Sequence, residues 1–327
     1  AGIQDLNIMG DGSVGTYFEW YGATSGTCFF FNGLQRARFI GFRVRNRSGA
    51  TATSRGIFIS RASGSGTQTV GLTFIGVEVG DSGLGFDRGI QIGDSANSRA
   101  GSEMTFVGCG FYSNTTGVYL DDSNTLDINF YQLLLGQNGT GIRGNAGSSV
   151  NVYGGSASGQ TVADFWFDAG GAVGINGYRS ENADRFFIGG FSTIGQCGVV
   201  LAGCNVAPVA NADGIGVVLN GAFTATIQGC KLQCEIACGA HAASGVVGAS
   251  LTLLNNGIAD TVPFQGGWAG NSINRLSYAV LGCVRLTGAD VVARFDDEIG
   301  AGDASNNRVA AWKRTATGDQ GFFNATP

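Results

Sequence analysis

Carboxylates recur directly after a short repeated motif in this chain. The motif is glycine, apolar, variable, apolar, and its copies are GIFI at Gly56, GIQI at Gly89, GVYL at Gly117, GIRG at Gly141 and the variant DFWF at Asp164. The residues that follow these copies include Asp94, Asp121, Asp122 and Asp168. A pair of carboxylates at a suitable separation can serve as acid and base, or as acid and nucleophile, in the cleavage of a glycosidic bond.

The spacing of the copies predicts how far apart these carboxylates lie. Strands on adjacent coils of a parallel sheet are ~4.8 Å apart, so Asp94 and Asp122 would lie about one coil apart, near the ~5–5.5 Å of a retaining glycosidase. Asp121 and Asp168 would lie two coils apart, at roughly 9.6 Å, near the separation of an inverting enzyme. These four are the candidate catalytic residues of a polysaccharide depolymerase, a glycoside hydrolase or a lyase. The alternative is structural, because aspartate in turns commonly bonds the local backbone.

The variable position of the motif is rich in aromatic residues. This third residue should point away from the core of a strand. With RFFI at Arg185 taken as a sixth copy, the outward residues are Phe58, Gln91, Tyr119, Arg143, Trp166 and Phe187. Contiguous exposed aromatic residues mark an interaction surface. Two interpretations remain open, a platform on which sugar rings stack beside Arg and Gln donors and the packing face of a homotrimer, with a loop folded over the stripe as the structural alternative.

A second apolar series alternates with the first along the chain. Its members are FIGF at Phe39, FIGV at Phe74, FVGC at Phe106, INFY at Ile128, VNVY at Val150 and VGIN at Val173. Two interleaved strand series with one period predict a coil, and units too short to bury their own apolar faces must stack into a solenoid. We expect one buried column to contain Ile57, Ile90, Val118, Ile142 and Phe165, and we expect Gln91 and Arg143 to be exposed.

The composition agrees with an all-β repeat. The chain has 327 residues with 57 Gly and 3 Pro, and 43% of the residues are hydrophobic, which is typical of many strands joined by tight corners. We expect one long β-solenoid domain over residues 1–289. Residues 290–327 alternate apolar and polar residues without the coil signature, so we expect a C-terminal cap or oligomerisation segment there.

Charge is distributed unevenly, although the net charge is only −5. Residues 20–77 contain seven Arg and no acid, whereas residues 78–127 contain eight acids against two Arg. The acidic balance argues against a nucleic-acid partner. Two interpretations of the polarity remain open: solvated outward positions, or complementary ends that meet neighbouring chains or an anionic glycan.

Cysteine and histidine give little support to metal or nucleophilic chemistry. Four of the eight Cys directly follow Gly, and we expect buried residues that stack inside the coil. Cys230, Cys234 and Cys238 are four apart and should share one strand face, but no zinc-type spacing accompanies them. His241 is the only histidine, and the acidic run Asp296 to Glu298 is the one candidate for a bound cation. We expect no cofactor, no metal site and no membrane span.

The first residues carry a resemblance to a known superfamily. GIQDLNIMGDG at residues 2–12 resembles the entry coil of the pectate-lyase-like right-handed parallel β-helix superfamily. The later FxGxxxxN and GIxI coils are similar to those of bacteriophage tailspikes within it, and the resemblance covers roughly residues 1–250. The histidine motif of the polygalacturonase branch is missing.

This resemblance implies a fold and a function. The fold would be a single-stranded right-handed parallel β-helix. The function would be that of a tailspike or receptor-binding protein, a homotrimer on the virion surface or otherwise extracellular. Its partners would be bacterial surface polysaccharide and other virion proteins, with cleavage of the glycan left open. The alternative is a non-catalytic virion decoration or structural adhesin.

Overall fold

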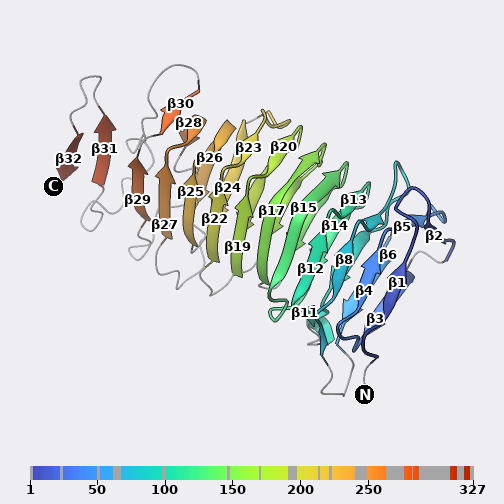
Figure 1. Ribbon diagram of the computed structural model, residues 1–327. Coiled ribbons are helices and arrows are strands. Elements are labelled where there is room, and N and C mark those ends of the chain that lie inside the picture. The colour runs from blue at the N-terminus through green and yellow to red at the C-terminus, as the bar shows by residue number, and fades with distance from the viewer. Residues whose placement is uncertain are drawn as a thin grey trace.

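The chain folds into a parallel β-solenoid whose successive coils lie side by side along one axis (Figure 1). The structure is a computed structural model, and it describes residues 3–22, 25–49, 52–61, 68–97, 101–145, 148–168, 171–190, 197–212, 214–220, 223–239, 249–262, 276–281, 283–286, 310–314 and 320–324. The strands of each coil pair in parallel with those of the coils before and after it. The predicted all-β solenoid is therefore confirmed.

Three series of paired parallel strands within one continuous sheet surround the core, and we name them faces A, B and C in the order in which the chain enters them. Face A contains β1 (Asn7–Met9), β4 (Arg38–Ile40), β8 (Thr73–Ile75), β12 (Met104–Val107), β15 (Ile128–Gly136), β17 (Ser148–Ser158), β19 (Gly171–Asn176), β22 (Cys197–Ala202), β25 (Phe223–Gln228), β27 (Ala249–Leu254) and β29 (Leu276–Leu281). Face B contains β2 (Tyr17–Trp20), β5 (Arg43–Asn46), β9 (Glu78–Val79), β13 (Gly110–Tyr112), the ends of β15 and β17, β20 (Arg179–Glu181), β23 (Asn205–Val206), the starts of β26 (Lys231–Gly239) and β28 (Gly257–Val262), and β30 (Val284–Arg285).

Face C follows face B in each coil and carries the glycine motif. Its strands are β3 (Thr27–Asn32), β6 (Arg55–Ser60), β10 (Arg88–Ile92), β14 (Thr116–Leu120), β16 (Thr140–Gly144), β18 (Ala163–Phe167), β21 (Phe187–Gly190), β24 (Ile215–Asn220) and the ends of β26 and β28. The loops that lead back to face A carry the short strands β7 (Thr69–Val70) and β11 (Gly101–Ser102) and the 3-10 helix η1 (Ser95–Asn97).

The corner between faces A and B explains the glycine of the FxG motif. The residue at this corner has a positive φ in coil after coil: Gly41, Gly76, Gly108, Gln132, Gly154, Gly177, Gly203, Gly229 and Asn255. Glycine adopts this left-handed conformation without the steric cost that a β-carbon brings. The chain therefore turns sharply here, and the next side chain points into the core.

The corner between faces B and C is held by buried amides. Asn114 accepts a hydrogen bond from the backbone N–H of Phe86 at 2.9 Å, and its own N–H donates to the side chain of Asn138 at 3.0 Å. Asn138 repeats the pattern with Gln160, 2.9 Å away. Buried backbone groups at a turn need such partners, so these amides link one coil to the next.

The predicted buried column is confirmed on face C. Ile57, Ile90, Val118, Ile142 and Phe165 are in register on successive strands, and each is at most 1% exposed. Behind face A a stack of phenylalanine rings runs through Phe39, Phe74, Phe106 and Phe130, with neighbouring ring centroids 4.6–4.7 Å apart. These two columns form much of the core.

The register of the second apolar series differs from the expected one. Ile128 lies opposite Met104, and Phe106 lies opposite Phe130, so the INFY copy is displaced by two residues. A shift of two keeps the same side chains inside, because strand side chains alternate with period two. The similar segments GVVLAG and GVVLNG lie on different faces, since β22 belongs to face A and β24 to face C.

The cysteine predictions have mixed outcomes. Cys109, Cys204, Cys230 and Cys283, which follow the corner position, are buried as expected. The shared strand face is wrong for Cys230 and Cys234, because Cys230 precedes β26, which then turns from face B to face C with a shift of register between Leu232 and Glu235. The side chain of Cys238 lies outside the described residues.

The C-terminal segment is described only in part. Within residues 290–327 the structure describes β31 (Ala310–Arg314) and β32 (Gln320–Asn324), which form an antiparallel pair. His241 and the acidic run 296–298 lie outside the described residues. No helix in the described part of the chain is long and apolar enough to cross a membrane.

Candidate functional site

The outward residues of face C form one continuous column. Phe58, Gln91, Tyr119, Arg143 and Trp166 are in register on successive strands, as the motif predicts. The column begins one coil earlier than expected, at Phe30, which is 51% exposed and stacks on Phe58 with ring centroids 5.0 Å apart. Phe30 was missed because β3 lacks the glycine of the motif. The signal was the run Phe29-Phe30-Phe31, whose central ring must point outward when its neighbours point inward.

Phe187 is not part of this column. It pairs with Phe165 and is fully buried, and the residue that continues the column after Trp166 is Ile188. The sixth copy was therefore placed one residue out of phase. Its phase is reversed because Phe186 and Phe187 both enter the core, where Phe186 packs edge-on against Phe165 with centroids 5.7 Å apart.

Guanidinium groups lie over the aromatic rings of the column. The Cζ atom of Arg88 is 3.9 Å from the ring centroid of Tyr119, and that of Arg143 is 4.4 Å from Trp166. Arg55 lies over Phe58 at 4.8 Å. Burial and the neighbouring charge of Arg88 lower the pKa of Arg55. Arg55 and Arg88 were not among the predicted site residues, although Arg immediately precedes the glycine in both copies, RGIFI and RGIQI.

Gln91 is buried, which corrects the expectation that it is exposed. Only 2% of its surface is accessible. Its carbonyl oxygen accepts hydrogen bonds from Arg55 and Arg88, the latter at 2.6 Å. Its amide nitrogen donates to Asp121 at 3.2 Å. Gln91 is therefore covered by Arg88 of its own strand and by Arg55 of the adjacent strand. Arg143, the other residue that we expect to be exposed, is partly exposed.

The candidate carboxylates form a polar row beside the column. Asp121, Asn145 and Asp168 follow successive strands and are tied in register by backbone hydrogen bonds. Asp121 is 9% exposed and accepts hydrogen bonds from Ser95 at 3.0 Å and Asn145 at 3.1 Å, in addition to the one from Gln91. These bonds occupy both of its oxygens.

The other three carboxylates differ in their surroundings. Asp168 accepts a hydrogen bond from Arg143 at 2.8 Å, so this carboxylate orients the guanidinium that covers Trp166. Asp122 is 6% exposed and accepts from the backbone N–H of Asn124 at 2.9 Å, which is the turn role that the structural alternative describes. Asp94 is half-buried, and its charge acts on Arg55. The catalytic role of these four residues stays a prediction.

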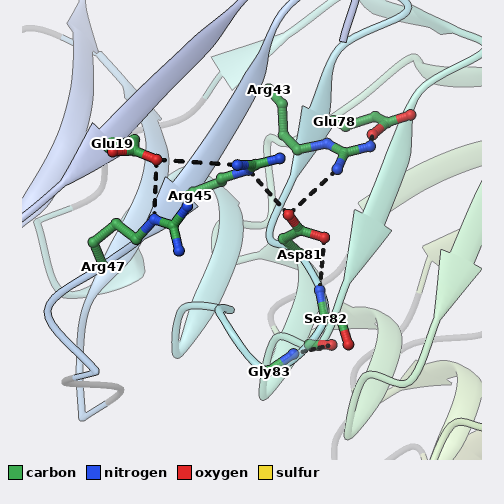
Figure 2. Close-up of polar contacts among 9 residues, drawn as sticks. Glu19, Arg43, Arg45, Arg47, Glu78, Asp81, Ser82 and Gly83 are labelled. Carbon is green, nitrogen blue, oxygen red and sulfur yellow. Dashed lines mark hydrogen bonds and ion pairs between the residues drawn. The ribbon is translucent and has the colours of Figure 1, made fainter. Parts of the chain in front are cut away.

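The uneven charge is partly neutralised inside the chain, on face B (Figure 2). Arg43 of the basic segment contacts Glu78 and lies 3.4 Å from Asp81, both of which belong to the acidic segment one coil later. Arg45 lies 3.0 Å from the same Asp81. Glu19, one coil earlier, accepts a hydrogen bond from Arg47 at 2.9 Å, and this bond lowers the pKa of Glu19. These arginines thus bind acids of neighbouring coils.

Comparisons with known proteins add no assignment. No protein-family model matches the chain, and no curated protein matches it.

Within the described residues no group of three or more His, Cys, Asp or Glu side chains is placed to hold a metal ion. A hollow of about 370 Å³ lies over the first coils of face A, between Arg36, Arg38 and Thr73, away from the aromatic column. The candidate site is the column of outward side chains on face C, from Phe30 to Trp166.

Proposed function

We propose that face C binds an extended polysaccharide of a bacterial cell surface. The observation that supports this proposal is the column of rings and guanidinium groups from Phe30 to Trp166, which runs along the solenoid axis. A polymer laid along this axis would meet a new coil every ~4.8 Å. At the coils of Gln91 and Tyr119, which are 2% and 9% exposed, it would meet the guanidinium groups of Arg55 and Arg88 that cover them. Sugar rings present C–H groups that pack on aromatic faces, and their hydroxyl groups can bond to the adjacent Arg, Asn and Asp side chains.

The biological setting follows from the sequence resemblance. The entry coil and the repeated motifs resemble those of bacteriophage tailspikes, so the chain would be a tailspike or receptor-binding protein on the virion surface. In that setting it would assemble as a homotrimer and attach to other virion proteins. The parallel β-solenoid is compatible with this assignment.

Binding without cleavage is the better supported form of this function. The oxygens of Asp121 are engaged by three side chains, and Asp168 is held by Arg143. A general acid or base must reach the bond that it acts on, directly or through one water molecule. A depolymerase remains the second candidate, because Asp121 and Asp168 do lie in one row and Asp168 lies beside the Arg143–Trp166 pair.

The test is to incubate the protein with purified capsular and O-antigen polysaccharides, and to measure binding and the release of oligosaccharides separately. We expect one polysaccharide to bind without the release of fragments. Release that is lost in Asp121→Asn or Asp168→Asn, with binding retained, would establish the depolymerase instead. Failure to bind any polysaccharide from a broad panel would contradict both forms of the proposal.

A further inference from the structure

Two thiols lie against each other inside the solenoid, at the corner between faces A and B. Cys204 and Cys230 each follow a corner glycine, and register places them opposite each other, because Asn205 pairs with Lys231. The backbone N–H of Cys204 donates to the sulfur of Cys230 at 3.3 Å. The residues are 1% and 2% exposed, and neither forms a disulfide.

We propose that Cys204 and Cys230 form a disulfide across two consecutive coils when the protein meets a small peroxide oxidant. Residues in register on adjacent parallel strands have Cα atoms ~4.8 Å apart, within the ~4.4–6.8 Å that disulfides span. To close the bond, the sulfurs must leave the carbonyl oxygens of Ile175 and Leu201, each 3.5 Å away. Thiols are weak donors, so these contacts oppose closure little.

The surroundings make the two thiols unequal. The Cys204 thiol and its backbone N–H both donate toward the sulfur of Cys230, and these bonds lower the pKa of Cys230 against the opposing effect of burial. The same contact raises the pKa of Cys204. Because the thiolate is the nucleophile, Cys230 should react first and Cys204 should resolve the product.

The oxidant has to be small because the pair is buried, and hydrogen peroxide meets this requirement. The Cys230 thiolate attacks one peroxide oxygen, the O–O bond breaks, and hydroxide leaves, so that Cys230 becomes a sulfenic acid. The sulfur of Cys204 then attacks the sulfur of Cys230, the S–O bond breaks, and the oxygen leaves as water with the proton of Cys204. In total, two thiols lose two electrons and one peroxide becomes two water molecules.

The chain contains a matched control for this reaction. Cys109 occupies the same corner position after Gly108, and its sulfur lies 3.5 Å from the carbonyl oxygen of Phe74, just as the sulfur of Cys204 lies 3.5 Å from that of Ile175. The residues on either side of Cys109 in this column are Val77 and Leu133, because Val107 pairs with Ile75 and Tyr131. Cys109 is thus an equally buried thiol without a thiol neighbour.

The series of adjacent thiols stops at Cys230 in this column. The next residue along it is Asn256, whose amide accepts from the backbone N–H of Cys230 at 2.9 Å and contacts the sulfur of Cys283 at 3.6 Å. Asn256 therefore separates Cys283 from Cys230, so the cross-link should join Cys204 to Cys230 alone.

The experiment treats the full chain with hydrogen peroxide under native conditions, then alkylates it in denaturant and maps its peptides by mass spectrometry. We expect a cross-linked peptide joining Cys204 and Cys230 and an unmodified thiol at Cys109. In Cys204→Ala, Cys230 should instead be trapped as a sulfenic acid by dimedone that is added together with the denaturant. The oxidised wild type should unfold roughly 5 °C above its reduced form, because the bond constrains the unfolded chain.

Peroxide also oxidises methionine, and Met9 is exposed, so the shift in unfolding temperature is compared with that of Cys204→Ala treated in the same way. A shift that is present in both proteins would not come from the cross-link and would count against it. The proposal would be overturned if Cys109 were oxidised as fast as Cys230, or if the folded protein gave no peptide joining Cys204 and Cys230.

Discussion

Face A directs its main row of aromatic rings into the core, whereas face C directs its main row outward. Behind face A, Phe39, Phe74, Phe106 and Phe130 stack inside the core. On face C the core column is mostly aliphatic, and the rings of Phe58, Tyr119 and Trp166 lie outside under guanidinium groups. The difference shows that one residue class at one strand period supports folding on one face and can support recognition on another. Four substitutions test this division and its surroundings, in order of decreasing effect.

Phe106→Ala should affect stability alone. Removal of a ring from the middle of the internal stack leaves a cavity, and we expect the free energy of unfolding to fall by about 3–5 kcal/mol. Denaturant unfolding measures this loss, with Thr105→Ala, the outward neighbour, as a control that should change stability little. A loss below about 1 kcal/mol would mean that the stack is not a structural core.

Asp164→Asn should change how stability depends on pH. Asp164 stands where the other copies have glycine, is fully buried, and burial raises its pKa to about 7. In the unfolded chain its pKa is ~3.9. The contribution of Asp164 to the free energy of unfolding is therefore fully present below about pH 4, and it is lost as the pH rises to about 7, because the unfolded chain then releases the proton that the folded chain retains.

The Asn variant carries no such proton, so it should be more stable than wild type at pH 8 by a few kcal/mol and should show a flatter profile between pH 4 and 7. Its amide can still bond to Gln160 and Ser180, which both contact Asp164 in the wild type. Denaturant unfolding at several pH values makes the measurement. Parallel profiles for the two proteins would contradict an elevated pKa at Asp164.

Trp166→Ala should affect binding far more than folding. The side chain is outside the core, and its loss should weaken binding of the cognate polysaccharide about tenfold or more, corresponding to ~1.4 kcal/mol. Tyr153→Ala is the matched control, because Tyr153 is an outward ring on face A, 41% exposed and stacked on Tyr131. Titration calorimetry compares the two variants. Equal losses would mean that recognition is not confined to face C.

Asp168→Asn should have the smallest effect. The ion pair of Asp168 with Arg143 is partly exposed, with 23% and 34% of the two side chains accessible, so we expect its removal to cost less than about 1 kcal/mol of stability. The difference from wild type should shrink further at 1 M salt, because salt screens exposed charges. A larger, salt-independent loss, measured by denaturant unfolding, would show that the pair is part of the fold and not of the outer surface.

Much of the solenoid could be predicted from sequence because glycine marks the phase of the repeat. Where a copy begins with Gly, as at Gly56, Gly89, Gly117 and Gly141, the inward column and its outward neighbours were placed correctly. Where the glycine is absent, the outcome varies: the copy at Asp164 was placed correctly, but Phe30 was missed and Phe187 was assigned to the wrong side of the sheet. Adjacent phenylalanines satisfy an alternating pattern in either phase.

The fold class, the corners and the buried column could be inferred from the residue pattern, because they depend on backbone conformation and on a period that is local in the chain. The state of the outward side chains became visible only in the folded molecule. Gln91 is buried by Arg55, which precedes it by a whole coil, and Arg43 finds its acids on the following coil. Contacts between coils depend on how each long side chain bends toward its neighbours, and a repeat pattern carries no information about that direction.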